Sequence, residues 1–220
     1  SVLKGLVSTP QGRLPSARFL RLALGSGLGV FLLQISGTFQ SVWAMSAVGA
    51  LGFVLSIFTL PRLLPKGTFR LKRGIPALVM TRLLMMGAVT GAEVVMPLLL
   101  QRIHGWSANT ASLAVTIATL SWASGAFIQS QFKNRRVRLL LPKIGSCMIV
   151  IGLAPLSMLL NPSLPKWPVF IAWLLSGIGV GFTHSTISDF TLGSTDPSMH
   201  GRASSWLQVA DSAGAAVELA

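Results

Sequence analysis

The fold class is decided by the apolar stretch Ile75–Leu100, which reads IPALVMTRLLMMGAVTGAEVVMPLLL and contains two charged side chains, Arg82 and Glu93. A transmembrane α-helix needs about 20 mostly apolar residues, because a rise of about 1.5 Å per residue must cover a hydrocarbon layer about 30 Å thick. The stretch is long enough, and membrane helices tolerate internal residues such as Gly87 and Pro97. It therefore predicts a helix that crosses a membrane.

Five more stretches of similar length and composition lie on either side of it. Hydrophobic residues make up 51% of the 220-residue chain and charged residues only 10%, whereas a soluble domain has about 25% charged residues. The predicted spans are Leu22–Phe39, Val42–Leu60, Ile75–Leu100, Ala108–Ser130, Leu139–Leu160 and Trp167–Phe190, and a seventh begins near Ala203. The sequence thus predicts an all-α, multi-pass protein whose surroundings are a lipid bilayer.

The net charge of +13 comes from 18 Lys and Arg against five Asp and Glu. A clustered basic face would indicate nucleic-acid binding, but these cations are dispersed. Fifteen of them lie before the first span, in the link 61–74, between residues 133 and 143 around the start of the fifth span, and just before the seventh span. Links rich in Lys and Arg alternate with poor ones, and cytoplasmic links carry the excess. We therefore expect cytoplasmic basic links in a cell (plasma) membrane protein, and no nucleic-acid partner.

Other classes of site are absent from the sequence. The single Cys147 excludes an intramolecular disulfide framework, and no Cys/His cluster has the spacing of a metal site. No G-x-x-x-x-G-K-[ST] motif is present, so nothing indicates ATP binding. We expect no metal and no cofactor.

The chain has features of one part of a duplicated protein. It starts at Ser1 and ends within an apolar segment, so we expect it to be an internal piece of a longer chain. A shift of 189 positions superimposes small and basic residues: Gly12-Arg13 on Gly201-Arg202, Ser16 on Ser205, and Gly25 on Gly214. Two six-helix halves related by a parallel repeat are typical of major facilitator transporters.

Several segments resemble helices of that superfamily. They are Gly91–Leu100 for the seventh helix, Gly105-Trp106-Ser107 and Ser121–Gly125 for the two ends of the eighth, Ala172–Gly181 for the tenth, and Trp206–Asp211 for the eleventh. On these residues the chain resembles a bacterial major facilitator permease of the drug-efflux-like branch.

The resemblance implies a major facilitator bundle seen from the fifth helix to part of the eleventh. Residues 1–60 would then complete the N-terminal bundle, 61–74 would form the basic linker, and 75–220 would belong to the C-terminal bundle. The implied function is secondary active transport of a small solute by alternating access, with proton-coupled export of a hydrophobic or cationic compound as the leading form. The resemblance also makes Arg135, Arg136 and Arg138 candidates for a cytoplasmic gate loop, although the acidic residue that often precedes such a cluster is missing here.

Glu93 is the leading candidate for transport chemistry. A charge at the bilayer centre costs roughly 2.5–3.5 kcal/mol even on the lenient insertion scale, so the carboxylate should face protein or water and bind a proton or a cation. Arg82 lies eleven residues earlier at almost the same helical angle, and Thr90 and Pro97 share that general face, which predicts a pathway. Arg82 could instead snorkel to the membrane surface, and Glu93 could be structural.

Asp211 and His184 are further candidates for proton coupling, with structural hydrogen bonding as the alternative for each. Gly177 and Gly181 form a small-residue stripe that allows helices to approach closely. Asp189, near the end of its predicted span, is expected to be solvated or to anchor a loop.

Two other classes of function stay open, although we expect no enzyme. A polytopic membrane enzyme would need a catalytic set of acids or His in the cytoplasmic links, where Asp196 and His200 form no known motif. A transport-inactive membrane scaffold is the other alternative.

Overall fold

The structure, a computed structural model, describes residues 17–218, with side chains up to residue 216. The described chain is helical and contains no strand. Its α-helices are α1 (Ala17–Ser36), α2 (Val42–Leu63), α3 (Ile75–Arg102), α4 (Ala108–Gln131), α5 (Arg135–Leu153), α6 (Trp167–Gly193) and α7 (His200–Glu218). Three short 3-10 helices join them: η2 (Thr68–Arg70), η3 (Ala154–Leu160) and η4 (Pro197–Met199). Of the N-terminal copy of the predicted repeat, Gly12-Arg13 and Ser16 lie outside the described residues.

Six of these helices are long and apolar enough to cross a membrane, namely α1 to α4, α5 continued by η3, and α6. Each coincides with one of the six predicted spans, so the all-α membrane fold class is confirmed. Their ends follow local chemistry. The Ser107 hydroxyl accepts a hydrogen bond from the Thr110 amide at 3.2 Å and caps α4, and Pro76 and Pro168 stand in the first turns of α3 and α6.

The predicted starts of two spans were wrong. Helix α1 runs from Ala17 to Ser36 rather than from Leu22 to Phe39, and α5 begins at Arg135 rather than at Leu139. In both cases arginines that the sequence analysis placed in a link occupy the first turns of a helix, because Arg is a good helix former whose long side chain keeps its charge in water. At α5 the Asn134 side chain accepts a hydrogen bond from the Arg136 amide at 2.9 Å, which fixes the start.

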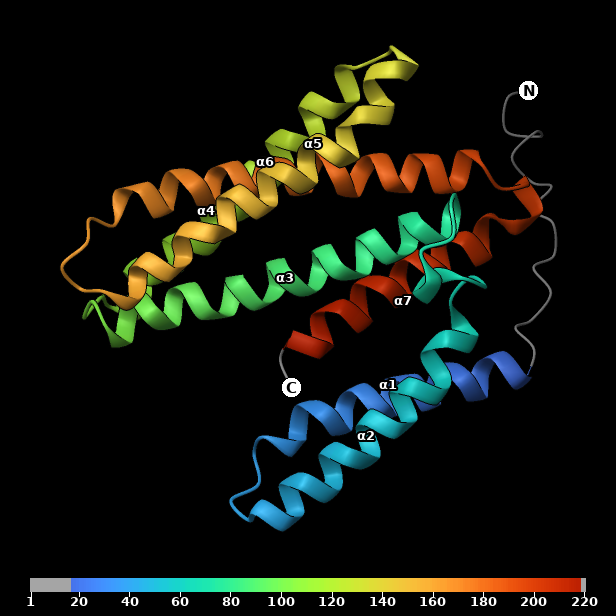
Figure 1. The fold of residues 1–220 in the computed structure, drawn as a ribbon, viewed down its shortest axis with the longest axis horizontal. Coiled ribbons are helices and arrows are strands. Elements are labelled where there is room, and N and C mark those ends of the chain that lie inside the picture. Colours follow the sequence, from blue (N-terminus) through green and yellow to red (C-terminus); the bar gives the residue numbers. More distant parts are fainter. Residues whose placement is uncertain (1–16, 219–220) are drawn as a thin grey trace, which may run out of the picture.

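Neighbours joined by one link, α1 with α2 and α5 with α6, run antiparallel, whereas α4 runs parallel to α6 and α3 parallel to α7 (Figure 1). Helix α6 packs along both α4 and α5, and α3 packs along α7. Figure 1 shows the α1–α2 pair at one side of the molecule, with α7 between this pair and the other helices. Outward-facing apolar side chains such as Leu24, Trp43 and Phe127 are strongly exposed, as expected of surfaces that face lipid.

The contact between α4 and α6 depends on Gly177 and Gly181. A methyl group built on Gly181 would lie 2.5 Å from the carbonyl oxygen of Trp122, and one built on Gly177 would lie 2.6 Å from the hydroxyl oxygen of Ser121. Real side chains do not pack at such distances, so the backbones meet closely only because both residues are glycine. As a result, residues of α4 and α6 form one common wall opposite Val89 and Glu93 of α3.

A candidate site in the interior of the bundle

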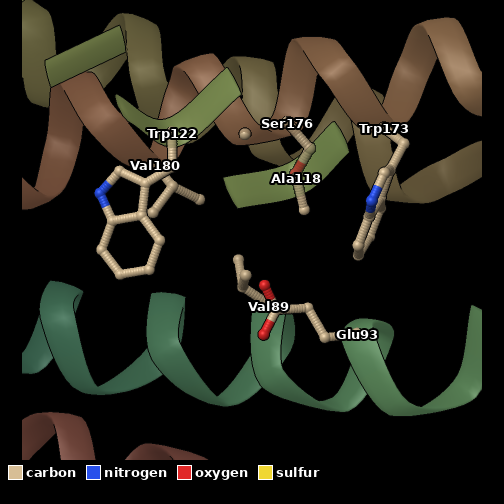
Figure 2. Close-up of a pocket in the computed structure, with 8 residues that line it drawn as sticks. Val89, Glu93, Ala118, Trp122, Trp173, Ser176 and Val180 are labelled. Atoms are coloured by element: carbon tan, nitrogen blue, oxygen red, sulfur yellow. The ribbon is translucent and has the colours of Figure 1, made fainter. Parts of the chain in front are cut away.

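Glu93 projects from α3 into a hollow that α4 and α6 close on the other side (Figure 2). The other residues that line it are Val89, Ala118, Trp122, Trp173, Ser176, Gly177 and Val180. The half-buried carboxylate has no hydrogen-bond or salt-bridge partner among the described residues. The hollow has a cavity volume of about 10 Å³, close to the minimum that one water molecule needs. In this conformation it has room for water or a proton but not for a solute.

The two tryptophans of this hollow are held differently. Trp173 is only 2% exposed, and its indole N–H donates a 2.9 Å hydrogen bond to the carbonyl oxygen of Ala114, which fixes the ring. Trp122 is half-buried, and its indole N–H has no acceptor among the described residues. Figure 2 shows both rings pointing from the α4 and α6 side toward α3, one on each side of Glu93. Indole faces attract cations, so the hollow combines an acid with two cation-attracting surfaces.

Arg82 lies closer than Glu93 to the N-terminal end of α3, which follows the basic link. It forms a bidentate ion pair with Asp211 of α7. Its Nε donates to Oδ1 at 2.6 Å and its Nη2 to Oδ2 at 2.7 Å. The third nitrogen, Nη1, donates to the Ser188 hydroxyl at 2.6 Å and to the His184 carbonyl oxygen at 3.2 Å. Arg82 is 4% exposed, so the snorkelling alternative is wrong. The buried guanidinium connects α3, α6 and α7.

His184 completes this cluster. Its Nε2 lies 3.7 Å from Asp211 Oδ2, and its ring meets the Trp122 ring edge to face with centroids 5.1 Å apart. The sequence placed Asp211, Arg82 and His184 as separate candidates, and the structure brings the three together. Glu93 stands apart, since eleven residues of helix correspond to about 16 Å. Thr90 and Pro97 are half-buried on the same helix, and neither lines the Glu93 hollow.

A second, larger hollow opens at the end of the bundle that carries the basic links. It has a volume of about 710 Å³ and is lined by Gln129, Ser130, Phe132, Lys133, Arg138, His184, Ser185, Ser188 and Asp189. Asp189 accepts hydrogen bonds from Arg138 Nη2 and, at 3.2 Å, from Gln129 Nε2. The acidic partner that the sequence near the arginine cluster lacks is therefore supplied by α6. The side chains of Arg135 and Arg136 are exposed.

Sequence reasoning missed Trp122, Gln129 and Ser188 as site residues. The available signal was their spacing: Trp122 and Gln129 are seven residues apart on α4, and His184 and Ser188 four apart on α6, so each pair shares one helix face. Nothing in the sequence indicates which helix each face meets.

These features are those of a multi-pass helical membrane protein with ionisable groups enclosed between its helices. The family model described as Major Facilitator Superfamily matches residues 12–217. The chain belongs to this superfamily of membrane transporters, whose members are transporters rather than enzymes. A comparison with curated proteins found no match.

Proposed function

We propose that this protein moves a small solute across the cell membrane by proton-coupled secondary transport, with Glu93 as the coupling group. The observation that carries the proposal is a carboxylate inside a membrane span with no partner among the described residues. An isolated charge in this environment is costly, and a proton or a bound cation would remove the cost. Membership of the superfamily makes alternating access the expected mode.

The size of the Glu93 hollow favours the proton over the solute in this conformation. About 10 Å³ accommodates at most one water. We infer that the solute enters only when α3 moves away from α4 and α6, and that Trp122 and Trp173 then provide surfaces for a hydrophobic or cationic compound. A single acid, Glu93, that binds the proton and the compound alternately would suit export of the compound in exchange for protons.

Asp211 is the weaker coupling candidate because Arg82 already neutralises it through two short hydrogen bonds. We infer that the Arg82–Asp211–His184 cluster holds α3, α6 and α7 together as one unit. In this proposal α1 and α2 belong to the other bundle, and the basic segment 61–74 links the two bundles on the cytoplasmic side. The close packing of α3 on α7, compared with the slight contact between the α1–α2 pair and α7, supports this division.

The test separates coupling from binding in one preparation. Inside-out membrane vesicles that contain the full-length protein would be assayed with the organic cation tetraphenylphosphonium, first for accumulation driven by a pH gradient and then for exchange without a gradient. For Glu93→Gln we expect accumulation to be lost, with exchange retained if the carboxylate carries only the proton and lost if it also holds the cation. The matched control is Asp196→Asn, the same change at an exposed acid outside the spans, which should leave both activities unchanged. Unchanged gradient-driven accumulation in Glu93→Gln would refute the proposal.

A further inference from the structure

The contact between Trp122 and His184 lies between the two hollows of the bundle. Trp122 lines the Glu93 hollow and His184 lines the larger hollow at the basic end. Their rings meet at a centroid distance of 5.1 Å with an interplanar angle of 69°. The rings are thus in direct contact where one hollow ends and the other begins.

The order of residues along both helices supports this position. On α6, Val180 lines the Glu93 hollow, His184 follows one turn later, and Ser188 lines the basic-end hollow after one further turn. On α4, Trp122 is followed two turns later by Gln129, which lines the basic-end hollow. Residues spaced by four or seven share a helix face, so the two hollows lie in series along one α4–α6 surface.

The two partners differ in how firmly they are held. The His184 imidazole lies 3.7 Å from Asp211, and its backbone carbonyl accepts a 3.2 Å hydrogen bond from Arg82. The half-buried Trp122 indole has no hydrogen bond among the described residues, in contrast to the anchored Trp173. Trp122 is held by apolar and ring contacts alone, among them its packing against Met85, Val89, Ile149 and Val180. Of the two rings it is therefore the one that can change rotamer without breaking a hydrogen bond or an ion pair.

We propose that Trp122 is a gate that closes the Glu93 hollow toward the basic end of the bundle, with His184 as the fixed surface on which it rests. When the indole swings off His184, the two hollows join, and water or protons from the cytoplasmic side reach Glu93. An aromatic pair is a weak contact, so the Trp122 ring can leave His184 while the Arg82–Asp211 ion pair stays in place. The inference rests on the proposed function for its direction, since it takes the basic end as cytoplasmic.

The experiment measures access to the hollow rather than transport. The full-length protein would carry Cys147→Ser, which removes the exposed native cysteine, and Ser176→Cys, a near-isosteric probe on the wall of the Glu93 hollow. A membrane-impermeant methanethiosulfonate reagent would be applied to each face of sealed vesicles in turn, without solute or pH gradient. We expect Trp122→Ala to raise the labelling rate of position 176 about tenfold from the basic-link face, the upper range for loss of an aromatic pair, and to leave labelling from the other face unchanged.

Two comparisons keep the result interpretable. Trp122→Phe preserves an aromatic ring against His184 and should label at the parent rate, and Trp167→Ala removes a tryptophan that is 65% exposed and lines neither hollow, so it should have no effect. If Trp122→Ala does not fold in detergent, Trp122→Leu replaces it with the same expected direction. Labelling at the parent rate in the folded variant, or an equal increase from both faces, overturns the gate. This readout needs no transport, so a gate that opens in a protein showing no proton-driven accumulation would refute the proposed function alone.

Discussion

Replacing Asp211 with Asn would leave the Arg82 guanidinium buried without its counter-charge. Arg82 and Asp211 side chains are 5% and 20% exposed, and two hydrogen bonds of 2.6 and 2.7 Å join them. Removing one partner of a buried pair costs about 3–5 kcal/mol, because the remaining charge stays desolvated. Since a fifth of the Asp211 side chain is exposed and Asn can still accept one bond, we expect the lower end, about 3 kcal/mol of unfolding free energy.

A double-mutant cycle isolates the pair. Asp211→Asn, Arg82→Met and the double variant would be unfolded in detergent by SDS titration. The double variant should be less destabilised than the sum of the single variants by at least about 1.5 kcal/mol, because it leaves no unpaired charge. The matched control is Asp189→Asn, which breaks the half-exposed pair with Arg138 and should cost about 1 kcal/mol or less. Additivity within about 0.5 kcal/mol across the Arg82–Asp211 cycle would mean that the two side chains do not stabilise each other.

Three further predictions concern packing and local electrostatics. Gly181→Ala would place a methyl group 2.5 Å from the Trp122 carbonyl oxygen and the Ala126 amide nitrogen. Because this pushes α4 and α6 apart, the variant should lose about 1–3 kcal/mol of unfolding free energy. The control is Gly193→Ala, whose methyl group would have nothing within 4 Å and should leave the melting temperature unchanged. Trp173→Phe loses the hydrogen bond to Ala114, and a drop of about 1 kcal/mol is expected in the same unfolding assay. Hydrogen bonds from the Ser198 hydroxyl and amide lower the pKa of Asp196. The η4 turn should therefore keep this stabilisation above about pH 3.9 and lose it as pH falls through the lower folded-state value. The expected readout is a drop in the protection factor of the Ser198 amide, that is, its exchange rate relative to an unprotected amide at the same pH; a constant protection factor across that range would contradict the assignment.

The spans could be predicted from the sequence because the bilayer imposes a length and a polarity on every helix that crosses it. Stretches such as Ile75–Leu100 satisfy both conditions whatever their neighbours are. The ends were harder, because Arg135 and Arg136 look like link residues until the Asn134 cap and their snorkelling side chains make them the first turn of α5. Charge alone does not separate a link from a solvated helix end.

The site could be predicted as a set of single residues but not as a geometry. Glu93, Arg82 and Asp211 stand out because charges are rare inside spans. The Arg82–Asp211 pair joins residues 129 positions apart, and such a pairing depends on the rotation of each helix about its own axis. The same holds for Asp189, whose contact with Arg138 replaces an acid that the local sequence lacks. The rotation of each helix is set by packing at small residues such as Gly181, and the periodicity of the sequence does not determine it.

Proton release upon solute addition would show whether Glu93 couples solute movement to protons. Purified full-length protein in weakly buffered detergent solution would receive tetraphenylphosphonium while a pH-sensitive dye reports protons. We expect about one proton to be released per protein at pH values where Glu93 is protonated, and none from Glu93→Gln. Equal release from both proteins, or binding without release in the unsubstituted protein at every pH tested, would contradict it.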